Sequence, residues 1–409
     1  MSTPQESPKP SVSVLEAAQH ARKKPVRSGG QFAWLRGLLL SDYFVLYLTL
    51  FIYITAAIIL PQLGKSNTLA LPGNIANQLS NMWPLLAIAI GQTFVLILGS
   101  IDLSMGATMG ITSVVGALVM AETLDASTFD KSPLWGGLIT DAGGILNTNF
   151  GATVGDPTVV LIGIVAMLGL GVLIGFLNGF AITRFNMPPF MVTLVTLTFF
   201  ANFALWLTAS RNISSLPEGF ITLGSGDLIS VFIGPKLESQ IARREILPAI
   251  TYPAVISIGL AFVGQWILSR TVFGRQMFSI GTNKRASQIS GLPTSRVVIM
   301  VYMFSGFCAA VASILYSARL EIGQPSLGSG NILLDVIGAA VIGGTSLFGG
   351  KGSVRGTVLG VAFFVFLANV LNALQLSPFV IDAVKGVMIL TAALLDITRT
   401  RLATSEGRA

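Results

Sequence analysis

A stretch of forty residues, from Met82 to Ala121, contains a single charged side chain, that of Asp102. As one α-helix it would extend about 60 Å, whereas the hydrocarbon core of a bilayer is about 30 Å thick. The segment is too apolar for a soluble domain and too long for one crossing of a membrane. The sequence therefore predicts two membrane-spanning helices with a break between them, close to the aspartate.

Similar apolar runs recur through the 409 residues, of which only 11% are charged. Soluble domains contain about 25% charged residues. The runs are continuous, which excludes the alternating strands of an outer-membrane barrel. We predict an all-α, polytopic membrane protein with about ten transmembrane helices. The predicted spans are about 43–63, 82–100, 104–121, 158–183, 189–209, 251–269, 297–318, 332–348, 356–375 and 379–397.

Basic residues predict how the chain is oriented. The loop 270–296 contains five of them and no acidic residue, and both terminal segments are also basic. With ten spans these segments lie on one side, which the positive-inside rule places in the cytoplasm. Arg243 and Arg244, on the opposite side, count against the rule. The expected organisation is a disordered cytoplasmic tail at 1–40, a transmembrane domain at 41–398 with outer segments at about 122–157 and 210–250, and a cytoplasmic tail at 399–409.

The sequence lacks the motif of a nucleotide site. The segment GGTSLFGGKGS (Gly343–Ser353) is glycine-rich, but a phosphate-binding loop requires G-x-x-x-x-G-K-[ST]. Thr345 stands in place of the first glycine and Gly352 in place of the final hydroxyl residue. We interpret these glycines as residues of a tight turn and of close helix packing.

Titratable residues are equally scarce. Cys308 is the only cysteine and His20 the only histidine, which argues against a disulfide and against a metal site. Asp102 is the only carboxyl group near the middle of the apolar runs, whereas ion-coupled carriers use intramembrane carboxylates. The net charge of +7 belongs to the cytoplasmic segments and predicts no nucleic-acid partner. We therefore expect no catalytic residue and no cofactor, and an energy source in a partner protein.

The loop 270–296 is the best candidate for contact with that partner. Within it, NKRASQIS predicts two turns of helix that end at Gly291, with Pro293 following. A short helix between two spans can seat in a groove of a soluble protein. The same loop can instead lie on anionic lipid, and the residues alone leave both interpretations open.

Several segments resemble the permease subunit of bacterial ABC-type sugar importers of the ribose/xylose kind, and the resemblance covers about residues 40–397. The segments are SIDLSMG, FGRQMFSIGTNKRASQISGLPTSRV, SGFCAAVASILYSARLEIGQPSLGSGNILLDVIGAAVIGGTSLFGGKGSVRGTVLG and VKGVMILTAALLD. The resemblance implies a location in the bacterial inner membrane, an ATPase subunit that binds the ATP, a second permease copy in a homo- or heterodimer, and a periplasmic sugar-binding protein. Relative to the family, 122–157 is an insert.

The resemblance also assigns a coupling role within the loop 270–296. The family's ATPase-coupling element aligns with Asn283, Ala286, Ser290 and Gly291, and the basic pair Lys284 and Arg285 lies within it. The leading interpretation is an importer of a monosaccharide or sugar alcohol, and two alternative functions stay open. One is the same importer class with nucleosides or branched-chain amino acids as cargo. The other is an ion-coupled secondary carrier.

A sugar pathway needs side chains that form reversible hydrogen bonds with hydroxyl groups, and aromatic faces against which a ring can stack. The same polar side chains can equally hold neighbouring helices together. Thr198 and Asn202 are four residues apart and share one helix face. The candidates within the predicted spans are Gln92, Asn178, Thr193, Thr196, Thr198, Asn202, Trp206, Asn369 and Asn372.

Asp102 lies where the second helix of the opening stretch begins. Its carboxyl group suits an N-cap, which accepts backbone N–H groups at a helix start. Ser104 follows, and the spacing of Gly106 and Gly110 lets that helix pack closely against a neighbour. A role of this break in gating or coupling stays open beside the capping role. A similar spacing, of a serine and two glycines, recurs at Ser353, Gly356 and Gly360, through an old duplication or through two similar helix starts.

Overall fold

The computed structural model divides the chain into two units, residues 1–44 and 45–409. It describes residues 44–64, 69, 71–151, 155–232 and 246–406. The expected tail at 1–40, with His20, lies outside the described residues. So do Arg243, Arg244 and residues 407–409 of the expected C-terminal tail.

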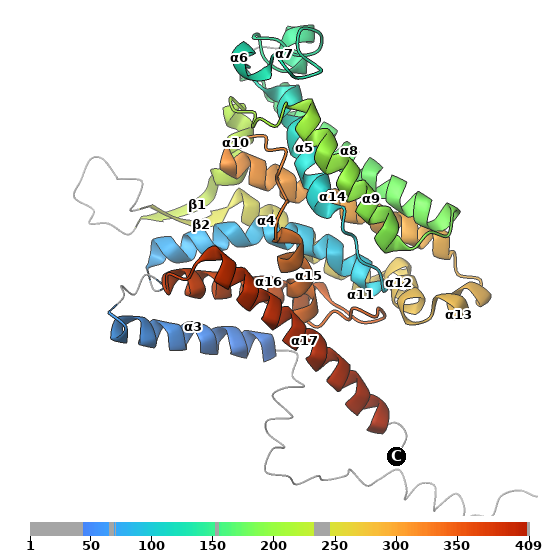
Figure 1. Cartoon of the computed structure of the whole chain (residues 1–409). Helices are drawn as coiled ribbons and strands as arrows, with labels where there is room; N and C mark the ends of the chain where they lie inside the picture. Colours follow the sequence, from blue (N-terminus) through green and yellow to red (C-terminus); the bar gives the residue numbers. More distant parts are fainter. Residues whose placement is uncertain (1–43, 65–68, 70, 152–154, 233–245, 407–409) are drawn as a thin grey trace, which may run out of the picture. The chain divides into compact units, whose positions relative to one another are not determined.

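Each of the ten predicted spans corresponds to a helix (Figure 1). Two of these helices are short and apolar, α5 (Met105–Met120) and α15 (Ile332–Ile342), and the last is α17 (Pro378–Glu406). The prediction of a helical, polytopic membrane protein is confirmed. Within the part of the chain that the structure describes, seven helices are long and apolar enough to cross a membrane: α3 (Phe44–Gln62), α4 (Pro72–Ile97), α8 (Pro157–Arg184), α9 (Pro189–Leu207), α11 (Tyr252–Arg270), α14 (Thr294–Leu320) and α16 (Val354–Ala373).

Three predicted boundaries are wrong, and one of them is the end of α17, which lies at Glu406 instead of 397. Helix α4 begins at Pro72, ten residues before the predicted start at 82, because its first turns are polar on a face that hydropathy alone reads as a loop. Helix α15 ends at Ile342 instead of 348. Gly343 and Gly344 follow, and Gly344 has φ +90°, a conformation that ends an α-helix and that glycine adopts without strain.

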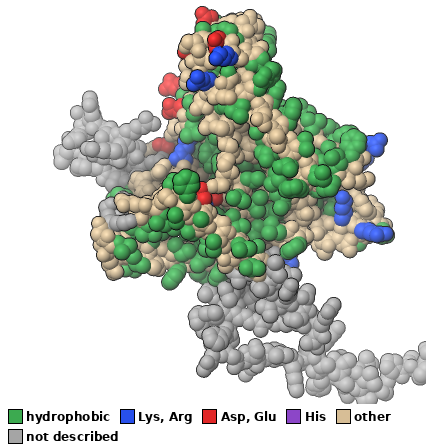
Figure 2. Space-filling model, viewed as in Figure 1, with side chains coloured by type: hydrophobic (Ala, Val, Ile, Leu, Met, Phe, Trp, Pro, Cys, Tyr) green, Lys and Arg blue, Asp and Glu red, His purple; other side chains and the backbone are tan. Residues whose placement is uncertain are grey.

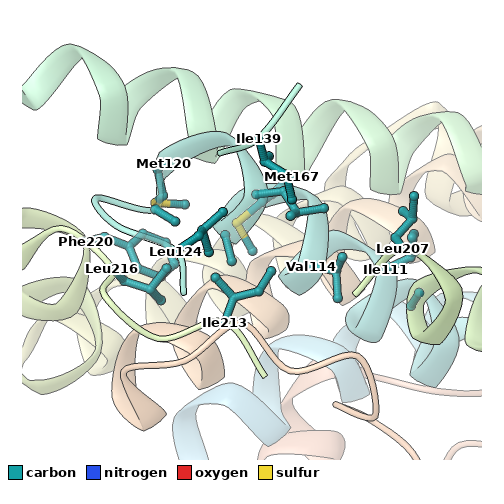
Figure 3. Packing of buried hydrophobic residues seen from close by; sticks show 14 of the residues in the cluster. Ile111, Val114, Met120, Leu124, Ile139, Met167, Leu207, Ile213, Leu216 and Phe220 are labelled. Carbon is teal, nitrogen blue, oxygen red and sulfur yellow. The ribbon is translucent and has the colours of Figure 1, made fainter. Parts of the chain in front are cut away.

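The described part of the segment 122–157, which we expect to be an insert relative to the family, packs against the helices. It contains two short helices, α6 (Ala126–Phe129) and α7 (Ile145–Phe150). Its residues Leu124, Phe129 and Ile139 are buried in one apolar cluster with Met120 of α5 and Met167 of α8 (Figure 3). The burial of these side chains anchors the insert to the transmembrane helices.

The segment at 210–250 contains the strands that the all-α prediction omits. After α10 (Glu218–Ser225), the strands β1 (Asp227–Phe232) and β2 (Ile246–Thr251) pair antiparallel. Both are rich in β-branched or aromatic residues, which favour strands.

Glycines set how closely the helices approach. On α8, a methyl group added at Gly175 would meet the backbone of Tyr302 in α14, and on α16 one added at Gly360 would meet that of Ala339 in α15. These helices therefore pack backbone against backbone, as small residues allow in membrane proteins.

The partner of Gly106 and Gly110 is not the neighbouring helix that the spacing predicts. Added methyl groups there would meet the carbonyl oxygens of Gly328 and Pro325, in the non-helical segment 321–331 between α14 and α15. The backbone N–H of Gln324 in this segment donates to the hydroxyl of Ser113 on α5, at 2.9 Å. Non-helical backbone inside a membrane bundle requires such protein partners.

Candidate functional site

A cavity of about 480 Å³ lies among α4, α14, α15, α16 and α17. Its size is within the range of roughly 300–1,000 Å³ typical of small-molecule sites. Amide side chains dominate its polar lining, and an acidic and a basic residue lie opposite them. The lining residues are Asn74, Asn77, Gln78, Asn81, Leu85, Tyr316, Ile332, Asp335, Phe364, Val365, Ala368, Asn369, Asn372 and Lys385.

The amides of α4 come from its unpredicted N-terminal turns. Asn74, Asn77, Gln78 and Asn81 are spaced by three or four residues and therefore share one face of the helix. Arg319 of α14 fixes this face, since its Nη1 donates to Asn81 Oδ1 at 2.7 Å and its Nη2 to Asn77 Oδ1 at 2.9 Å. The polar stretch is helical because its side chains find partners across the cavity wall.

The opposite wall is formed by α15, α16 and α17. Asn74 Nδ2 donates to Asn369 Oδ1 of α16 at 3.4 Å. Lys385 Nζ of α17 lies 2.8 Å from Asp335 Oδ2 of α15 and 3.8 Å from Asp382 Oδ1. Asp335 Oδ1 is buried without a hydrogen-bond partner among the described residues. The cavity thus offers amide donors and acceptors and one ion pair to a polar ligand.

The structure separates the polar candidates of the sequence. Asn369 and Asn372 line the cavity, whereas Thr198, Asn202 and Trp206 are on α9, outside it. Thr198 and Asn202 are exposed and bond the backbone of their own helix at 3.0 and 2.8 Å. Trp206 is 58% exposed and stacks on a neighbouring phenylalanine of the same helix.

Two further candidates, Thr193 and Gln92, are buried among helices. Thr193 Oγ1 donates to the backbone of its own helix at 3.0 Å, and Gln92 is completely buried on α4. Sequence reasoning missed Arg319, Lys385 and the amides of α4. The three- and four-residue spacing of those amides was the signal that marks them as a helix face.

Asp102 connects four helices through hydrogen bonds. Its Oδ1 accepts the Ser104 backbone N–H at 2.9 Å and the Ser104 hydroxyl at 2.6 Å. Its Oδ2 accepts the hydroxyl of Ser305 on α14 at 2.7 Å. Asn178 of α8 donates to Ser104 Oγ at 2.9 Å, and Thr196 of α9 donates to Asn178 Oδ1 at 2.6 Å. A single polar network therefore joins α14, the start of α5, α8 and α9.

The bond that the capping prediction requires is present, since the Asp102 carboxylate accepts a backbone N–H at the start of α5. Helix α5 begins at Met105, so Ser104 is its N-cap residue, and the Ser104 side chain makes no capping bond. Asp102 accepts a backbone N–H just before the helix. Its second carboxylate oxygen accepts the hydroxyl of Ser305 on α14. Asp102 is a connector between helices more than a cap of one helix.

The predicted helix of the loop 270–296 is present. After α12 (Val272–Thr282), α13 (Lys284–Ile289) begins with Asn283 as its N-cap, whose Oδ1 accepts the Ala286 N–H at 2.9 Å. Ser290 follows as the C-cap residue, and Gly291 has φ +78°.

The surface of α13 is charged and partly apolar. Lys284 and Arg285 are exposed, and Ile289 is 82% exposed. Lys and Arg side chains gather in this region without acidic neighbours in the view of Figure 2.

Helix α12, which precedes α13, packs against the backbone at the end of α4. A methyl group added at Gly281 of α12 would meet the carbonyl of Ile97, at the end of α4. The same carbonyl accepts the N–H of Gly350 at 2.9 Å. Gly350 belongs to the glycine-rich segment 343–353, between α15 and α16. The end of α4, α12 and this segment therefore meet in one backbone junction.

Comparison with known proteins decides the family. The family model for the permease component of branched-chain amino acid transport systems matches residues 74–393. This chain belongs to that permease family. The permease is 33% identical to the ribose import permease protein RbsC of Bacillus subtilis over 328 residues, 80% of this chain and 85% of that protein.

Two further relatives are similar to the permease over most of their length. RbsC of Haemophilus influenzae is 30% identical over 323 residues, 79% of this chain and 84% of the relative. The xylose transport system permease protein XylH of the same organism is 28% identical over 370 residues, 80% of this chain and 90% of the relative. No solved structure matches the permease.

The network around Asp102 predicts a contrast between two substitutions. Asp102→Asn keeps an oxygen for Ser104 and supplies an N–H that the Ser305 hydroxyl can accept, so we expect the melting temperature in detergent to change little. Asp102→Ala leaves buried donors unpaired, at about 1–3 kcal/mol each, and we expect clear destabilisation.

Asp125 is the matched control. It accepts the same pair of bonds from Ser127 on the surface, at 3.0 and 2.6 Å, and these hydrogen bonds lower the pKa of its carboxyl group. Because water can replace the exposed Asp125 carboxylate as the hydrogen-bond acceptor, Asp125→Ala should destabilise the protein much less than Asp102→Ala. Equal melting temperatures for Asp102→Ala and the wild type would contradict the role of the network.

Proposed function

We propose that the permease forms the membrane pathway of an ATP-driven importer in the bacterial inner membrane, and that its cargo is a monosaccharide or sugar alcohol. The amide-rich cavity carries this proposal. An amide offers both donors and an acceptor, which suits the hydroxyl groups of an uncharged sugar. Tyr316 and Phe364 add aromatic side chains to the lining.

The family description favours a second cargo, a branched-chain amino acid. Such a ligand needs an apolar socket for its side chain and free charges for its ammonium and carboxylate groups. In the cavity, however, Lys385 and Asp335 are paired with each other at 2.8 Å. The relatives at about 30% identity named for ribose and xylose support the sugar.

The proposed assembly contains two permease copies, an ATPase subunit that binds the ATP, and a periplasmic binding protein that delivers the sugar. The orientation follows from the basic residues, with α13 in the cytoplasm. In that orientation the Pro72 end of α4, where the cavity lies, faces the periplasm. The permease itself then needs no cofactor.

Reconstitution tests the function. Proteoliposomes with the permease, its ATPase subunit and its binding protein should accumulate labelled ribose or xylose only when ATP is supplied on the ATPase side. An uncoupler should have little effect, because no ion gradient drives the step. Uptake that needs no ATPase and collapses with the uncoupler would contradict the proposal. Uptake of leucine without uptake of sugar would show that the cargo is a branched-chain amino acid.

A pair of asparagines tests the cavity. Asn372→Leu removes an amide from its lining, and we expect several-fold slower uptake of the transported sugar. Asn202→Leu changes an exposed asparagine of α9, outside the cavity, and should leave uptake near the wild-type rate. Both variants should be compared at equal amounts of inserted protein. Equal sugar-uptake rates for the two variants would contradict the proposal that the cavity is part of the pathway.

We further propose that α13 docks on the ATPase subunit. Its exposed basic pair, Lys284 and Arg285, lies about one turn from the exposed apolar side chain of Ile289. An interface with a charged rim and an apolar centre is typical of specific protein contacts. Its N-cap bond and the backbone junction below hold this helix in a defined position.

Charge reversal tests the docking. The double substitution of Lys284→Glu and Arg285→Glu should leave membrane insertion intact but abolish sugar-stimulated ATP hydrolysis and uptake, because it reverses the charge of the contact. Arg184→Glu, at the exposed end of α8 on the same side, is the control and should retain both activities. Normal sugar-stimulated hydrolysis in the double variant would refute the role of α13.

A further inference from the structure

The strongest feature outside the cavity is the side chain of Gln92. It is 0% exposed, and neither its Nε2 nor its Oε1 has a hydrogen-bond partner among the described residues. Buried polar groups of native proteins are normally paired, and an unpaired one calls for an explanation. In a membrane bundle the cost is higher still, because lipid offers no partner.

The neighbours of α4 establish where Gln92 points. Ile90 and Phe94 face Gly264 of α11, Gly91 faces Cys308 of α14, and Thr93 bonds Thr357 of α16 at 2.7 Å. Successive helix residues are rotated by about 100°. Gln92 is therefore on the side opposite α11, between α14 and α16, where α15 packs.

The same face of α4 lines the cavity. Gln92 follows Asn74 by eighteen residues, which is five turns of an α-helix, so the two side chains project from one side. Leu85, also on this face, lines the cavity, and Gln92 is two turns, or about 10 Å, beyond it.

One turn beyond Gln92 the seam between α4 and α15 is closed. Leu96 is buried with Ala340 and Val341 of α15 in one apolar cluster. Along this seam the order is the polar cavity, then Gln92, then the apolar closure. An unpaired amide between a polar cavity and an apolar closure is what a second hydrogen-bonding stage of a pathway requires.

Helix α15 is short and has a glycine turn at each end. Its 11 residues extend about 16 Å, half the thickness of the hydrocarbon core. Gly330 before it and Gly344 after it both have positive φ, +77° and +90°. Discontinuous helices with flexible ends form the substrate sites of many transporters.

We propose that Gln92 is a second binding subsite for the hydroxyl groups of the cargo, reached from the cavity when α15 moves away from α4. The proposal rests on the sugar-import function above. In the closed arrangement the amide is dry and unpaired; in the open one it bonds cargo hydroxyls, and Leu96 with its partners on α15 closes the route beyond it.

The first experiment separates a structural from a transport role. Gln92→Met keeps the size of the side chain and removes the unpaired amide. If Gln92 were only a packing residue, this variant would transport as well as the wild type. We expect an equal or higher melting temperature together with at least ten-fold slower ribose or xylose uptake, and partial recovery in Gln92→Glu, which restores hydrogen-bond acceptors.

The second experiment tests access to the site. Cys308 is the only cysteine, so Cys308→Ala provides a cysteine-free background. In that background, Gln92→Cys should react with a small sulfonate thiol reagent faster during ATP turnover of the reconstituted complex than at rest. Ile90→Cys, equally buried but facing α11, is the control and should stay unreactive in both states.

The outcomes distinguish this inference from the function on which it rests. If the wild type imports sugar but Gln92→Met also transports at the wild-type rate, the subsite is refuted and the function stands. Equal protection of both cysteines during turnover refutes the access route in the same way. If the wild type imports no sugar, the function fails first, and labelling then reports only whether the seam opens.

Discussion

A bilayer offers no hydrogen-bond partners, so a polar group inside the bundle raises the free energy unless it finds a partner within the protein or lines an aqueous space. The carboxyl group of Asp102 meets this constraint completely. Its bonds to Ser104 and Ser305 continue through Asn178 to α9. Because these bonds come from α14, α8 and the start of α5, the helix break can exist only in this arrangement of helices.

The cavity satisfies the same constraint in a second way. Its amides are paired sparsely, with contacts as long as 3.4 Å between Asn74 and Asn369, and Asp335 keeps a free oxygen. Around Asp102, by contrast, all five connecting bonds are 2.9 Å or shorter, and the side chains of Asp102, Ser104, Ser305 and Asn178 are buried. The tight network holds helices together, and the loose one leaves capacity for a ligand.

Hydropathy alone predicted a helix at each of the ten positions, because a run of apolar residues needs no knowledge of its neighbours. It missed the first turns of α4, since averaging over a window hides a helix with one polar face. Predictions that depend on the direction in which a side chain points were less successful. Asn372 and Asn202 look alike in sequence, yet only Asn372 lines the cavity. The partners of Asp102 were hidden for a related reason, since Ser305 lies 203 positions away.

The backbone junction at the end of α4 connects the proposed ATPase contact to the proposed pathway. Gly281 of α12 lies directly on the carbonyl of Ile97, which also accepts the N–H of Gly350. A contact between backbones has no flexible side chain to absorb a displacement. A shift of α12 and α13 therefore reaches both α4 and the segment that follows α15. Helix α4 and helix α15 hold the residues that close the seam, Leu96 on α4 and Ala340 and Val341 on α15. Coupling then needs no long relay of side chains, because the docking helices and the closure share this one junction.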